Sequence, residues 1–162
     1  LLACGEKSGQ ITVLDAETRQ VLNTISCGSD TRCIAFGPDG QLLATGHSDM
    51  TIRLWDAKSG RLEGELKGHD LAVRDLAFSP NGCTLLSGSD DGTIRVWSVP
   101  GRTAFGIFYR RIDDPTTDNL HRFDLSLNGK TLAMVNETET DGVPDVYVWR
   151  LTQDGPAVVT SK

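Results

Sequence analysis

The apolar positions of this chain form short runs that are separated by turn residues. Val73 to Phe78, Thr84 to Ser89 and Thr93 to Trp97 are three such runs, and Ser79-Pro80-Asn81-Gly82 and Asp90-Asp91-Gly92 separate them. Asn-Gly and Asp-Gly suit tight hairpin turns because both residues tolerate positive φ. No stretch sustains the 3.6-residue period of an amphipathic helix. The pattern therefore predicts an all-β protein with almost no helix.

One break in the alternation predicts a β-bulge. Leu76 and Phe78 alternate as expected for a half-buried strand, but Val73 lies three residues before Leu76 and is out of phase. One extra residue in the strand would restore the phase. Such a bulge would turn Arg74 and Asp75 toward the end or the axis of the array, where a partner could reach them.

A repeat of about 40 residues organises the whole chain. The segment 45–56 recurs 42 residues later as 87–98, and both copies contain Thr-Ile-Arg-x-Trp. Leu14 precedes Trp55 by 41 residues, and Trp149 follows Trp97 after 52. A fixed period of this length is typical of arrays in which each unit buries its apolar face against its neighbours.

Each unit also has a fourth, outer strand. The predicted outer strands are Val21 to Ile25, Arg61 to Leu66, Thr103 to Tyr109 and Ala157 to Thr160. We expect four antiparallel strands per unit and about fifteen strands in all, because the first unit begins inside its second strand. The expected units, within one domain 1–162, are residues 1–27 (incomplete), 28–67, 68–110 and 111–162.

Several of these motifs resemble the WD40-repeat (tryptophan–aspartate repeat) β-propeller family. The resemblance rests on Gly68-His69, on Phe78-Ser79-Pro80-Asn81-Gly82 and on the segment from Ser87 to Trp97. It implies propeller blades of four antiparallel strands and, at this length, just under four blades. We therefore expect an open partial propeller, a fragment of a larger seven-bladed ring, with open blade edges through which it could associate.

The resemblance also implies a buried hydrogen-bond network in the third unit. By position its members are His69, Ser87, Asp91 and Trp97. Ser, His and Asp are also the residue types of a hydrolase triad. Ser87 nevertheless lies in the middle of a predicted strand without a Gly-x-Ser-x-Gly turn, which favours the structural role.

The other units match the network less well. The second unit has Thr45, Asp49 and Trp55 but Cys27 where the His is expected, whereas Met134 replaces the Ser in the fourth. His47 and His121 are isolated, and we expect them to form local hydrogen bonds or to lie on the surface.

We expect no metal and no cofactor. The acidic residues Glu137, Glu139, Asp141 and Asp145 lie close together in sequence and could supply oxygen ligands to Ca²⁺, but they match no known calcium-loop spacing. A solvated loop is the favoured interpretation of this cluster.

Charge and cysteine content narrow the classes of partner. The net charge of −6 opposes binding to nucleic acid, which requires clustered cations. No apolar run reaches the ~18 residues that a membrane helix needs. The four cysteines, which form no Cys-x-x-Cys motif, are interpreted as reduced thiols of a cytoplasmic protein, and a Cys27–Cys33 disulfide is the alternative.

The predicted function is that of a non-catalytic interaction scaffold that binds a peptide or protein domain on a propeller face. The family's usual binding face implies the candidate residues Asp30, Arg32, Ser48, Ala72, Arg74 and Asp90. A set of arginines on successive inner strands, Arg32, Arg74 and Arg122, suggests an acidic peptide or another anion.

Two alternatives stay open. In the first, the chain is the sensor or regulatory propeller portion of a larger signalling enzyme, whose catalytic domain lies before Leu1. In the second, it is a propeller enzyme that uses its central channel, which would require carboxylates or histidines that converge on successive inner strands.

Overall fold

A computed structural model describes residues 1–6, 8–109, 122–126, 131–136, 145–152 and 155–161, and within them the chain is all-β, without helix. The strands of the first half are β1 (Leu2–Gly5), β2 (Gln10–Leu14), β3 (Val21–Ser26), β4 (Thr31–Phe36), β5 (Leu42–His47), β6 (Ile52–Asp56) and β7 (Leu62–Leu66). Those of the second half are β8 (Val73–Phe78), β9 (Thr84–Ser89), β10 (Thr93–Ser98), β11 (Thr103–Tyr109), β12 (Arg122–Leu125), β13 (Thr131–Asn136), β14 (Asp145–Thr152) and β15 (Gly155–Ser161).

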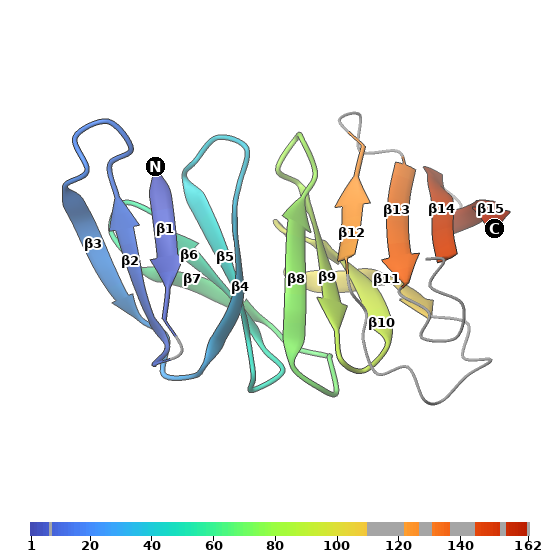
Figure 1. The fold of residues 1–162 in the computed structure, drawn as a ribbon, viewed down its shortest axis with the longest axis horizontal. Helices are drawn as coiled ribbons and strands as arrows, with labels where there is room; N and C mark the ends of the chain where they lie inside the picture. Colours follow the sequence, from blue (N-terminus) through green and yellow to red (C-terminus); the bar gives the residue numbers. More distant parts are fainter. Residues whose placement is uncertain (7, 110–121, 127–130, 137–144, 153–154, 162) are drawn as a thin grey trace.

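The strands form four antiparallel sheets that follow one another along the chain. Blade I is the three-stranded sheet β1–β3, and blades II, III and IV are the four-stranded sheets β4–β7, β8–β11 and β12–β15. In Figure 1 the blades stand side by side in an open arc, with blade I and blade IV at opposite ends. The predicted all-β partial propeller of just under four blades is therefore confirmed, and the predicted outer strands differ from the observed ones only at their ends.

The inner strands of neighbouring blades lie next to each other. β8 contacts β4 and β5 on one side and β12 on the other, and β1 lies beside β4. Within each blade the strands follow their order in the sequence, because each strand pairs with the next one through an antiparallel hairpin with a short turn.

The apolar cores lie between the blades. One core joins blade I to blade II and contains Ile11, Leu43 and Trp55. The next joins blade II to blade III and contains Leu54 and Trp97. Side chains alternate between the two faces of each strand, so blade II supplies residues to both cores. The blades thus depend on their neighbours for burial, as the repeat predicts.

The predicted bulge is present in blade III and has a counterpart in blade II. The register of β8 with β9 shifts between Val73 and Asp75, which leaves Arg74 as the extra residue. The register of β4 with β5 shifts between Thr31 and Cys33, which leaves Arg32 in the same position. Both bulges lie where the inner strand begins, and we call this side of the two blades the bulge end.

The turns at the bulge end need a left-handed backbone. Gly92 has φ 77° in the β9–β10 turn, and Met50 has φ 67° at the equivalent position of the β5–β6 turn. Glycine adopts this conformation without the steric cost that a side chain brings. The turn of blade II therefore has the same left-handed backbone conformation as the turn of blade III, with Met50 in place of the glycine.

Candidate functional site

At the bulge end of blade III, three of the predicted binding residues are in contact. The guanidinium of Arg74 donates from Nε to both carboxylate oxygens of Asp90 at 2.8 Å and from Nη2 to Oδ2 at 2.6 Å. The Asp90 amide donates to the carbonyl oxygen of Ala72 at 3.0 Å. The hydrogen bond with Asp90 raises the pKa of Arg74, which stays cationic. This corner is a surface ion pair held by the bulge, with the Arg74 side chain 45% exposed.

The bulge end of blade II has an arginine at the same position but a different ion pair. Arg32 Nη2 lies 3.0 Å from Oδ2 of Asp30, which directly precedes β4, and both side chains are about one-third exposed. The Ser48 amide donates to the Asp30 carbonyl oxygen at 3.0 Å. Arg32 therefore pairs with a neighbour in sequence, whereas Arg74 reaches across to the next hairpin.

The two bulges adjoin each other across the boundary between the blades. The Cys33 thiol, which follows Arg32, donates to the carbonyl oxygen of Val73, which precedes Arg74, at 3.7 Å. Burial raises the pKa of Cys33 to about 12, so the thiol stays protonated near neutral pH. The six predicted binding residues thus form two adjacent charged corners. Arg122 begins β12 on the next blade.

Beneath these corners, the predicted network of blade III is a continuous chain of hydrogen bonds. Trp97 Nε1 donates to Ser87 Oγ at 2.7 Å, and Ser87 Oγ lies 2.7 Å from His69 Nε2. His69 Nδ1 lies 2.7 Å from Asp91 Oδ2. With the neutral Nδ1–H tautomer of His69, every N–H and O–H in this chain has an acceptor. The network ties the entry to β8 to the β9–β10 hairpin.

Asp91 also organises the turn on its other side. Its Oδ1 accepts the Thr93 hydroxyl at 2.6 Å and the Thr93 amide at 2.8 Å. Burial raises the pKa of this carboxyl, but hydrogen bonds from Thr93, Asp70 and His69 outweigh it, so the pKa is lowered. Asp91 is therefore a carboxylate that accepts hydrogen bonds from three residues.

The buried histidines should make stability depend on pH. Burial lowers the pKa of both His69 and His47 below the ordinary value of 6.5, although Asp91 opposes this at His69. Between the folded pKa and 6.5 the unfolded chain binds more protons, so the free energy of unfolding should fall as the pH drops through 6.5. Urea denaturation at about pH 7.5 and about pH 5.5 measures this slope, and a flat profile would contradict two buried neutral histidines.

The Ser–His–Asp constellation does not have the geometry of a hydrolase site. Ser87 is fully buried in β9, at 0% exposure, and its oxygen already accepts the indole N–H of Trp97. A nucleophilic serine requires access to a substrate carbonyl and donors for the developing oxyanion. The arrangement instead satisfies buried polar groups.

Blade II corrects one sequence-based expectation. Cys27 does replace the expected His, but His47 supplies an imidazole from within β5: its Nε2 lies 2.7 Å from Thr45 Oγ1. Trp55 Nε1 donates to the same oxygen at 2.9 Å. The alternative that His47 lies on the surface is wrong, because its exposure is 0%.

Asp49 forms an ion pair with Arg53, whereas the equivalent Asp91 of blade III lies beside His69. Asp49 Oδ2 accepts from Arg53 Nη2 at 2.7 Å, and its Oδ1 accepts the Thr51 hydroxyl at 2.6 Å. Hydrogen bonds with Thr51 and Arg53 outweigh the opposing effect of burial and lower the pKa of Asp49 to about 2. The contact between Thr45 and His47 was not predicted from the sequence. The two residues are two positions apart in β5, so their side chains lie on one face of the strand.

The remaining candidates give no second site within the described part of the chain. No group of three or more His, Cys, Asp or Glu side chains there could hold a metal ion, and all four cysteines are free, including Cys27 and Cys33. Over the same residues, no helix is long and apolar enough to cross a bilayer. His121 and the acidic residues Glu137, Glu139 and Asp141 lie outside the described residues.

Comparisons with known proteins match two segments of the chain to the same repeat family. Residues 19–56 and 60–98 match the family model described as WD domain, G-beta repeat. A segment of 44 residues, 27% of this chain, is 52% identical to a segment of the nuclear distribution protein nudF 2 of Penicillium rubens, 10% of that protein. Another of 46 residues, 28% of the chain, is 50% identical to a segment of the pre-mRNA-splicing factor PRP46 of Candida glabrata, 11% of that protein. The matched segments span about a tenth of these relatives.

Proposed function

Because the chain belongs to the WD40-repeat β-propeller family, we propose that it is a non-catalytic scaffold that binds a peptide or a protein domain at the bulge end of blades II and III. The observation that carries this proposal is the pair of adjacent bulges, which present Arg32 and Arg74 at one surface. Strands below hold both arginines in place, so little conformational entropy is lost when a partner binds.

The geometry suggests an acidic partner segment. Arg32 and Arg74 each form an ion pair with a neighbouring carboxylate through part of the guanidinium group. Both side chains remain partly exposed and have further N–H donors. A carboxylate of a partner could share these donors in bidentate geometry. The net charge of −6 favours a protein over a nucleic acid at the same surface.

The proposal includes the wider context of the chain. We place it as one partial propeller, residues 1–162, of a cytoplasmic protein, with a protein or peptide rather than a nucleic acid or a membrane as its partner and without a cofactor. Leu2, Val21 and Leu22 of blade I are 52%, 60% and 46% exposed and are the side chains through which an open blade could associate.

Replacing both bulge arginines should remove partner binding without unfolding the chain. We expect Arg32→Ala combined with Arg74→Ala to reduce capture of the partner at least tenfold, because both cations would be absent. The midpoint of thermal unfolding should change little, since exposed ion pairs contribute only ~0–1 kcal/mol. Affinity capture from a cell extract with quantitative mass spectrometry measures the first effect, and circular dichroism measures the second.

The matched control removes two exposed cations from the outer strand of blade II. Arg61 and Lys67 form ion pairs with Glu63 and Glu65 at 2.6 and 2.8 Å. The variant Arg61→Ala with Lys67→Ala changes the net charge equally and should retain full capture. Equal loss in both double variants, or undiminished capture after loss of Arg32 and Arg74, would overturn the assignment of the bulge end.

A further inference from the structure

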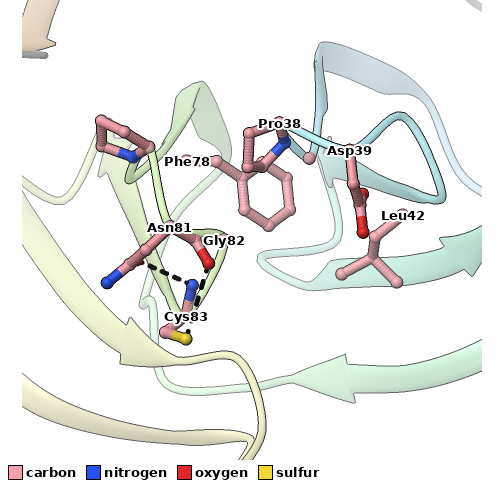
Figure 2. A pocket seen from close by; sticks show the side chains of 9 residues that line it. Pro38, Asp39, Leu42, Phe78, Asn81, Gly82 and Cys83 are labelled. Carbon is pink, nitrogen blue, oxygen red and sulfur yellow. Dashed lines mark hydrogen bonds between the residues drawn. The ribbon is translucent and has the colours of Figure 1, made fainter.

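The opposite end of blades II and III contains a groove. It lies between two related turns, Pro38-Asp39-Gly40 after β4 and Pro80-Asn81-Gly82 after β8, and encloses about 430 Å³. Figure 2 shows the Phe78 ring between these turns, with Leu42 on the side of blade II and Cys83 on the side of blade III. We call this cavity, lined by Pro38, Asp39, Leu42, Phe78, Pro80 and Cys83, the seam groove.

The seam groove continues along the boundary between the two blades. A second hollow of about 300 Å³ shares Asp39 and Leu42 with it and extends to Leu54 and Val99. Volumes of about 300–1,000 Å³ with mostly apolar walls and a few polar groups are typical of binding sites. Both volumes lie in this range, and the wall of the seam groove is mostly apolar.

Carboxylates dominate the charged lining. Asp39 is the one charged residue of the seam groove, and the second hollow adds Asp56, Glu63 and Arg102. The guanidinium of Arg102 packs against Gly64, where an added Cβ would lie 2.8 Å from its Nε. Asp39 and Asp56 also line a third hollow together, with Lys58 at its rim. The lining of the first two hollows therefore carries more negative than positive charge.

Both aspartates use one oxygen for their own turns. Asp39 Oδ1 accepts the Gln41 amide at 2.9 Å, and Asp56 Oδ1 accepts the Ser59 amide and hydroxyl, each at 2.7 Å. These bonds hold the carboxylates in place, and Arg61 adds a charge interaction at Asp56. A fixed carboxylate beside an apolar wall is suited to a lysine or arginine that follows an apolar residue.

We propose that the seam groove is a docking site for an extended peptide segment of a partner protein, which places an apolar side chain against Phe78 and Leu42 and a lysine or arginine beside Asp39 and Asp56. The site extends the proposed scaffold role, but it is a second surface, at the opposite end from Arg32 and Arg74. The seam groove is proposed to bind a cationic segment, whereas the bulge end is proposed to bind an acidic one.

Two exposed cysteines allow a direct test. Cys83 lines the seam groove, whereas Cys4 lies on β1 of blade I, and both are exposed free thiols. The probes are two pools of heptapeptides with Leu, Phe and Pro at randomised positions and a single Lys in one pool or a single Glu in the other. At about 1 mM peptide, where even weak binding is measurable, the Lys pool should slow alkylation of Cys83 by iodoacetamide at least threefold and leave Cys4 unchanged. Mass spectrometry of the tryptic peptides measures both rates.

Asp39→Asn is the matched variant. Its amide oxygen can still accept the Gln41 amide, so the turn is kept and only the charge is lost. We expect this variant to lose most of the protection at Cys83 and Arg74→Ala to retain it. No protection of Cys83, equal protection by both pools, or protection that survives Asp39→Asn would overturn the seam groove. Capture that depends on Arg32 and Arg74 would stand regardless, so the two proposals fail separately.

Discussion

Ser87→Ala is expected to lower the free energy of unfolding by about 2–4 kcal/mol, because it leaves two buried polar groups without their hydrogen-bond partner. Trp97 Nε1 loses its acceptor and His69 Nε2 loses its donor, each from a bond of 2.7 Å. Both side chains are nearly or fully enclosed, at 1% and 5% exposure, so water cannot readily replace the hydroxyl. Urea denaturation followed by tryptophan fluorescence measures the change.

Ser26→Ala is the control for this substitution. Ser26 also lies in a strand, β3, but it is exposed, so its removal should change stability by no more than ~0.5 kcal/mol. A loss at Ser87 no larger than the loss at Ser26 would show that the network contributes nothing measurable to stability. The assignment of His69, Ser87, Asp91 and Trp97 as a structural network would then be wrong.

Gly46→Ala should destabilise the chain by about 1–3 kcal/mol through overpacking between blades II and III. A Cβ at this position would collide with Cys33 Sγ and would lie 2.7 Å from Val73 Cγ1. Val73 is fully buried and Cys33 packs against the same core, so their side chains have little space into which to rotate. Differential scanning calorimetry should show a lower unfolding temperature.

Two further variants separate overpacking from the intrinsic effect of alanine. Gly106→Ala in β11 places its Cβ no closer than 3.5 Å to any neighbour and should be nearly neutral. Adding Val73→Ala to Gly46→Ala removes one of the two clashes, so the double variant should lose less stability than the sum of the single variants. Strict additivity would contradict a steric conflict between the blades.

Much of blade III could be predicted because its signals are local. The alternation of Leu76 and Phe78, the Asn-Gly and Asp-Gly turns and the out-of-phase Val73 all lie within one strand or hairpin. Strand pairing between neighbours in sequence is set by such patterns. The bulge at Arg74 followed from them and is present.

Blade II shows where this reasoning fails. Its Cys27 suggested that the network had lost its histidine, yet His47 forms a hydrogen bond with the same Thr45 oxygen that accepts from Trp55. The available signal was the spacing of Thr45 and His47, which places both side chains on one face of β5. Whether that face is buried depends on blade I, which packs over it with Ile11 and Val13.

The sequence by itself determined the repeat, the all-β blades and the bulge, because strand alternation and turn chemistry act over a few residues. The residues of the blade III network came from the resemblance to the WD40-repeat family. Only the tertiary structure decided that Arg74 pairs with Asp90 of the next turn while Arg32 pairs with Asp30, two residues before it. It alone brought the turns at Pro38 and Pro80 together into the seam groove. The two turns of the seam groove lie about 40 residues apart in sequence, and their contact follows from the packing of whole blades, which no local pattern encodes.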